Sequence, residues 1–132
     1  MTPAPRLLIT GASGTLGGPL AVQAAAAGWD VTATYLTRAD RVRAGKPVRL
    51  DLRDAGAVDA LVRQVQPDVI IHAAVTERSG DGYADAIRLA GRHIAQAAGT
   101  VGARLIALST DLVFDGSQPL YPEETPVQPS PH

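Results

Sequence analysis

The chain has 132 residues, a formal net charge of −1 and 45% hydrophobic residues, which suits one globular domain with an apolar core. The near-zero charge offers no basic surface for nucleic acid or an anionic membrane, and the absence of cysteine excludes disulfides, thiolate metal sites and a cysteine nucleophile. No apolar stretch is long enough to cross a bilayer and the N-terminus does not resemble a secretory signal, so we expect a cytoplasmic protein.

The chain opens with a predicted strand over Arg6–Thr10, a glycine-rich turn and an alanine-rich helix over Thr15–Ala27. The turn places Gly11, Gly14 and Gly17 at three-residue spacing. A pyrophosphate binds to backbone N–H groups at a helix N-terminus, and glycine lets the backbone approach it without a Cβ. The flanking strand and helix favour a dinucleotide-binding turn over a glycine-rich turn that binds nothing. No lysine follows the glycines, so an ATP-type P-loop is disfavoured.

Strands and helices then alternate along the chain. Asp54 is the predicted N-cap of a helix that runs through Val65 and ends before Pro67. The remaining predicted elements are strands over Val31–Tyr35, Val48–Leu50, Asp68–His72 and Arg104–Ser109, and a helix over Tyr83–Ala98. This alternation predicts an α/β fold of the Rossmann type, a doubly wound parallel sheet of about five strands in the order 3-2-1-4-5 with helices on both faces.

The character of the sequence changes at Asp111, after which prolines become frequent. We therefore expect a dinucleotide-binding Rossmann domain over residues 1–110 and a proline-rich loop over residues 111–132, which leads to a catalytic and substrate-binding region absent from the sequence. On this view the sheet is truncated at its C-terminal side and its fifth strand is an uncovered edge. Such an edge predicts a homo-oligomer, a completing partner or marginal stability.

The end of the second strand bears on the choice of cofactor. In NAD-binding proteins an acidic residue there hydrogen-bonds the ribose 2′-OH, but Tyr35–Arg38 contains no carboxylate. Arg38, with Arg41 nearby, suits a 2′-phosphate, so we expect NADP(H) to be favoured over NAD(H). Two alternatives remain open: the arginines form a solvated basic loop, or Asp40 reaches the ribose if the loop folds back.

Thr110 follows the fifth strand at its carboxyl end, which is where parallel α/β sheets bind their ligands. A hydroxyl there can hydrogen-bond a substrate carbonyl and polarise it as hydride arrives. The alternative is a strand-end threonine that bonds only to local backbone.

Four motifs spread over nearly the whole chain have a recognisable pattern. They are Thr10-Gly11-x-x-Gly14-x-x-Gly17, Asp51-Leu52-Arg53-Asp54, the run from Pro67 to Ala74, and the run from Ser109 to Gly116 with Tyr121 and Glu123 downstream. Together they resemble the extended short-chain dehydrogenase/reductase superfamily, and more narrowly its dTDP-4-dehydrorhamnose reductase-like branch, which acts on nucleotide-linked sugars.

The resemblance implies a role for each matching position. The glycine turn would hold the pyrophosphate, Asp51 and Leu52 the adenine, and Ala73 and Ala74 the nicotinamide-side ribose, while Thr110 would be catalytic. The full set of cofactor-binding candidates is Gly11, Ser13, Gly14, Thr15, Leu16, Gly17, Arg38, Asp51, Leu52, Ala73 and Ala74, and no metal is expected.

The sequence also departs from the family pattern. The family's Tyr-x-x-x-Lys pair is absent, because no tyrosine here has a lysine four residues on and Lys46 is the only lysine. By the family's spacing the tyrosine falls just after His132, and Arg88 stands where the family has an asparagine. The leading hypothesis is therefore the cofactor-binding part of an NAD(P)-dependent oxidoreductase that reduces a keto group of a nucleotide-linked sugar. The alternatives are an epimerase or dehydratase of the same fold, and a non-catalytic dinucleotide-binding or regulatory module.

Overall fold

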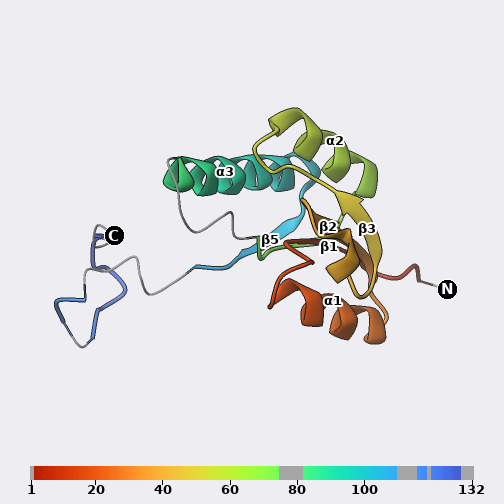
Figure 1. Ribbon diagram of the computed structural model, residues 1–132, viewed down its shortest axis with the longest axis horizontal. Coiled ribbons are helices and arrows are strands. Elements are labelled where there is room, and N and C mark those ends of the chain that lie inside the picture. Colours follow the sequence, from red (N-terminus) through yellow and green to blue (C-terminus); the bar gives the residue numbers. More distant parts are fainter. Residues whose placement is uncertain (1, 75–81, 110–115, 119, 129–132) are drawn as a thin grey trace.

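One parallel sheet forms the middle of the molecule (Figure 1). The computed structural model describes residues 2–74, 82–109, 116–118 and 120–128. In these residues the strands lie in the order β3-β2-β1-β4-β5, and every neighbouring pair is parallel. The strands are β1 (Arg6–Thr10), β2 (Asp30–Tyr35), β3 (Lys46–Arg49), β4 (Val69–His72) and β5 (Arg104–Ala107). The predicted fold class and strand order are confirmed.

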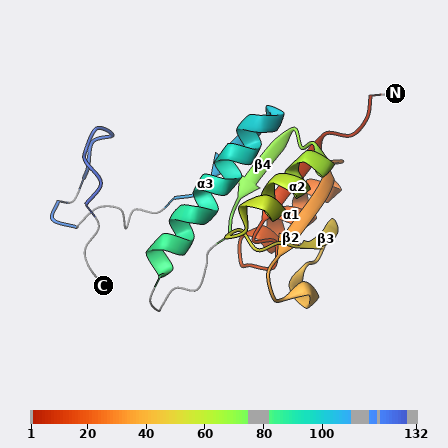
Figure 2. The same cartoon turned by 90° about the horizontal axis from the view of Figure 1, so that it is seen from above.

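Helices cover both faces of this sheet, as predicted. Helix α1 (Gly17–Ala26) lies against one face, and α2 (Ala55–Val65) and α3 (Tyr83–Val101) lie side by side on the other (Figures 1 and 2). A short 3₁₀ turn, η1 (Ala39–Arg41), connects β2 to β3. In the part of the chain that the structure describes, no helix is both long and apolar enough to cross a membrane.

Local signals explain where the helices begin and end. The Asp54 carboxylate accepts a hydrogen bond from the Ala57 N–H at 3.0 Å, which is the predicted N-cap of α2. Gln66 then ends α2 in the left-handed conformation, one residue before the predicted stop at Pro67. Helix α3 continues three residues beyond its predicted end, because Gly102 is the residue that adopts the left-handed terminating conformation.

Two further differences in the element boundaries have a local cause. Helix α1 begins at Gly17 and not at Thr15, since the residues before it complete the glycine turn. Strand β3 begins at Lys46 and not at Val48, because Gly45, with a φ of +82°, turns the chain back beside Val31 and starts the pairing there. At the edge where the candidate site lies, β1, β2 and β4 end as predicted, whereas β3 ends one residue and β5 two residues before the predicted end.

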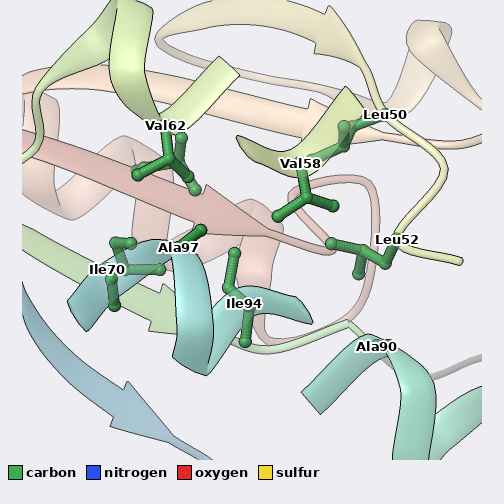
Figure 3. Close-up of a cluster of buried hydrophobic side chains, with 10 residues drawn as sticks. Leu50, Leu52, Val58, Val62, Ile70, Ala90, Ile94 and Ala97 are labelled. Carbon is green, nitrogen blue, oxygen red and sulfur yellow. The ribbon is translucent and has the colours of Figure 1, made fainter. Parts of the chain in front are cut away.

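The core consists of two clusters, one on each face of the sheet. Side chains alternate along a strand, so Leu8 of β1 faces α2 and α3 while Leu7 and Ile9 face α1. The larger cluster joins both helices to the sheet (Figure 3), and its buried residues are Leu8, Leu50, Leu52, Val58, Val62, Ile70, Ala90, Ile94, Ala97 and Ala98. It fixes α3 and the residues that follow β3 relative to each other.

Candidate dinucleotide-binding site

The candidate binding residues gather at one edge of the sheet. Parallel strands end at the same edge, and backbone hydrogen bonds join their extensions there. The Ala12 N–H donates to the Thr34 carbonyl at 2.9 Å, and the Leu50 N–H donates to the Tyr35 carbonyl at 2.8 Å. The glycine turn therefore lies on one side of the end of β2, and the residues after β3 lie on the other side.

Two glycines in the turn are required by its geometry. Gly11 has a φ of +71°, and a Cβ there would come within 2.6 Å of the Ala74 Cα. A Cβ at Gly17 would overlap the Gly11 carbonyl group, with its carbon only 2.7 Å away. The turn after β1 is therefore packed between the start of α1 and the backbone of Ala74, which brings the predicted pyrophosphate and ribose contacts together.

Gly14 has a different environment. It is exposed, and a Cβ added to it would meet a single neighbour within 4 Å, the Gly11 oxygen at 3.2 Å. Its missing side chain therefore leaves open space beside the turn, and does not relieve a clash inside the fold. A phosphate that approaches the backbone here would use the space that a methyl group would fill.

The N-terminus of α1, next to Gly14, has no side-chain cap. Leu16 at the N-cap makes no side-chain hydrogen bond, and the first turn carries no acidic residue. Among the described residues, the Gly14 N–H donates to the Gly11 carbonyl and the Gly18 N–H to the Gly14 carbonyl, whereas the N–H groups of residues 15–17 make no hydrogen bond. Such unpaired N–H groups and the positive end of the helix dipole favour an anion. Ser13 is half-buried and Thr15 is exposed, so hydroxyls are available beside these N–H groups. This part of the chain fits a pyrophosphate.

The Thr10 hydroxyl, to which the sequence analysis assigned no role, connects the end of β1 to the residues at and after the end of β4. Thr10 Oγ1 is buried and accepts hydrogen bonds from the N–H groups of Ala73 and Ala74, both at 3.2 Å. With both lone pairs used, the hydroxyl donates its proton to His72 Nδ1, 2.7 Å away. His72 is then neutral with its proton on Nε2, and burial lowers its pKa. The motif that contains His72 was visible in the sequence, but its partner 62 residues earlier was not.

The loop after β2 contains the residues expected to choose between NAD and NADP. Arg38 donates to Asp40 through Nε at 2.9 Å and through Nη2 at 2.7 Å, and both side chains are exposed. Hydrogen bonds from Arg38 lower the pKa of Asp40 to about 2. The guanidinium predicted to meet a 2′-phosphate thus already holds a carboxylate.

Asp51 and Leu52, the expected adenine contacts, lie just after β3. Arg53 donates to the Asp51 carboxylate from its side chain at 2.8 and 3.0 Å and from its backbone N–H at 3.0 Å. The side-chain hydrogen bonds are the main cause that lowers the pKa of Asp51 to about 2. Leu52 is buried in the larger core cluster, so its backbone and not its side chain is what this edge presents.

Thr110, the catalytic candidate, lies outside the described residues. Arg88, which the resemblance predicts to stand at the family's asparagine position, is exposed and forms an ion pair with Asp85 at 3.2 Å. Among the residues that the structure describes, no group of three or more His, Cys, Asp or Glu side chains is placed to hold a metal ion.

Comparisons with known proteins support the family resemblance that the sequence motifs indicated. Residues 5–131 match the family model described as "RmlD substrate binding domain". The chain is 38% identical over 133 residues to methionine adenosyltransferase 2 subunit beta of Xenopus tropicalis, covering 96% of this chain and 39% of that protein. It is 41% identical over 117 residues to dTDP-4-dehydrorhamnose reductase of Mycobacterium tuberculosis H37Rv, covering 84% of this chain and 34% of that protein. The chain thus spans well under half the length of these relatives.

Solved structures give the same fold. dTDP-4-dehydrorhamnose reductase from Bacillus anthracis, in complex with NADP, is 28% identical with a TM-score of 0.69, and the match covers 90% of this chain and 41% of that one. The Bordetella bronchiseptica enzyme WbmG, in complex with NAD and UDP, has a TM-score of 0.83 at 22% identity, covering 96% of this chain and 44% of that one. At that identity the second likeness shows the fold alone.

Proposed function

Because the chain belongs to the RmlD substrate binding domain family, in the extended short-chain dehydrogenase/reductase superfamily, we propose that it binds a nicotinamide dinucleotide at the turn between β1 and α1. The observation that carries this proposal is the uncapped N-terminus of α1 beside the open space at Gly14. The proposed whole function is reduction of a keto group on a nucleotide-linked sugar, of the dTDP-4-dehydrorhamnose reductase type, with this chain as the cofactor-binding part.

Each group of residues has a proposed task. The N–H groups of the glycine turn and of the start of α1 bind the pyrophosphate, Asp51 and Leu52 contact the adenine, and the backbone of Ala73 and Ala74 lies along the nicotinamide-side ribose. Bound in this way, the dinucleotide supplies the hydride. Thr110 hydrogen-bonds the substrate carbonyl. In this division residues 1–110 form the cofactor domain and residues 111–132 form the loop toward the substrate region.

NADP(H) is the proposed cofactor in preference to NAD(H), and Arg38 is its proposed anchor. The carboxylate of Asp40 occupies the Nε and Nη2 edge of this guanidinium. An exposed ion pair is held weakly in water, so a phosphate dianion can take the place of the carboxylate.

Paired titrations with NADPH and NADH test this preference. We expect Arg38→Ala to weaken NADPH binding about tenfold and NADH binding little, and Asp40→Asn to strengthen NADPH binding. Arg43→Ala, an exposed arginine further along the same connection, serves as the control and should leave both affinities unchanged. Equal losses for both dinucleotides in Arg38→Ala would contradict the assignment.

A second candidate function rests on the relatives named as subunit beta of methionine adenosyltransferase 2. Arg88, which the family resemblance places at the asparagine position, also favours a dinucleotide-binding subunit without turnover. Two assays separate the candidates. Oxidation of NADPH in the presence of dTDP-4-dehydrorhamnose supports the reductase, whereas co-sedimentation with a methionine adenosyltransferase supports the subunit.

A further inference from the structure

His93 lies in the middle of α3 and reaches out of its own helix. Its Nδ1 atom is 2.8 Å from the carbonyl oxygen of Leu52, 41 residues earlier in the chain. A carbonyl oxygen only accepts, so Nδ1 carries the proton and donates it. The side chain is half-buried between α3 and the residues that follow β3.

The bond joins α3 to the segment proposed to meet the adenine. Other hydrogen bonds of residues 50–54 join the segment to β2, lie within it, or reach the start of α2. Leu52 packs its side chain into the core near Ile94, one residue after His93 (Figure 3). With the side chain fixed by packing and the carbonyl fixed by His93, the peptide plane between Leu52 and Arg53 has one orientation.

That orientation determines what Asp51 and Leu52 present at the edge of the sheet. The Arg53 N–H belongs to this same peptide plane and donates to the Asp51 carboxylate at 3.0 Å. If the Leu52 carbonyl lost its donor, the peptide plane would be held less firmly, and any rotation of it would change the contact between the Arg53 N–H and Asp51. A site that is ordered before binding loses less entropy on binding. We therefore expect this hydrogen bond to raise the affinity for the dinucleotide.

We propose that His93 is a positioning residue that holds the segment after β3 ready for the adenine end of the dinucleotide. The inference rests on the proposed function. It assigns His93 no contact with the ligand and no part in hydride transfer. It predicts that a change at His93 lowers the affinity for the adenine half of the dinucleotide and leaves the affinity for the nicotinamide half unchanged.

The test uses 2′,5′-ADP and nicotinamide mononucleotide as separate probes of the two halves, by calorimetric titration of the whole chain. His93→Leu keeps the bulk and removes the donor, and we expect it to weaken 2′,5′-ADP binding about fivefold while leaving the mononucleotide unchanged. His93→Asn places an amide donor near the position of Nδ1, and we expect it to restore most of the loss. Gln96→Leu, a similar change at an exposed position of α3, is the control.

The outcomes are distinct. Wild-type affinity in His93→Leu, or equal losses in His93→Leu and His93→Asn, overturns the inference. Failure of the wild-type chain to bind either 2′,5′-ADP or NADPH overturns the proposed function instead. Should His93→Leu fail to fold, NMR of the wild-type imidazole decides, because a proton on Nδ1 that persists in the 2′,5′-ADP complex supports the inference and a proton on Nε2 overturns it.

Discussion

Gly14→Ala separates binding from folding at the proposed pyrophosphate site. Gly14 does not have a positive φ, so alanine can adopt its backbone conformation, and the new Cβ would meet only the Gly11 oxygen, at 3.2 Å. That contact requires the oxygen to move by a few tenths of an ångström, while alanine lowers the entropy of the unfolded chain. We therefore expect the free energy of unfolding to change by less than about 1 kcal/mol.

The same methyl group occupies the space through which a pyrophosphate reaches the backbone. We expect NADPH binding to weaken at least about tenfold, which corresponds to roughly 1.4 kcal/mol. Urea unfolding followed by circular dichroism gives the stability, and calorimetric titration gives the affinity. Gly18→Ala is the matched control, since its Cβ would make an ordinary contact with the Ala12 oxygen at 3.6 Å and should leave binding intact.

Gly17→Ala gives the opposite contrast. Its Cβ would overlap the backbone of Gly11, so this variant should lose stability and binding together. The reasoning is refuted if Gly14→Ala binds NADPH as tightly as the wild type. It is refuted equally if Gly14→Ala unfolds as readily as Gly17→Ala, because the absence of a side chain at Gly14 would then be a requirement of folding and not of binding.

The other predictions concern stability. Ile94→Ala removes a fully buried side chain from the larger core cluster and should cost about 2–5 kcal/mol in urea unfolding. Asp54→Ala removes the N-cap of α2 and should cost about 1 kcal/mol in the same assay, with Asp54→Ser retaining most of the stability. Burial lowers the pKa of His72, so the folded state favours the neutral ring, and stability that is complete above pH 6.5 should fall as the pH drops below it, by up to about 1.4 kcal/mol per pH unit. Urea unfolding between pH 7.5 and 5 checks this, and a slope that His72→Gln leaves unchanged would assign the effect to other groups.

Local patterns in the sequence predicted much of the fold. The glycine spacing after an apolar strand indicated the turn and its helix, and Asp54 marked the start of α2, because the residues that make these structures are neighbours in the chain. The strand order followed from the alternation of strands and helices. The start of β3 was predicted two residues late, because the pairing of Lys46 with Thr32 leaves no mark in either segment alone.

The candidate site was predicted as a set of positions but not as a set of contacts. The sequence left open whether Arg38 meets a 2′-phosphate, whether it belongs to a solvated basic loop, or whether Asp40 reaches the ribose. The structure pairs Arg38 with Asp40, which the sequence analysis had not considered. The bonds from Thr10 to His72 and from His93 to Leu52 span 62 and 41 residues, and no local pattern predicts a contact of that range. The role of Thr110 stays a prediction.

The central claim is that a nicotinamide dinucleotide binds with its pyrophosphate at the N-terminus of α1. A crystal structure of the chain grown with NADPH tests it most directly. We predict that the pyrophosphate lies against the backbone of Gly14 and the N–H groups of residues 15–17 at the start of α1, with the adenine toward Asp51 and Leu52. Crystals whose NADPH lies elsewhere on the molecule, or that hold none at saturating NADPH, would contradict the account.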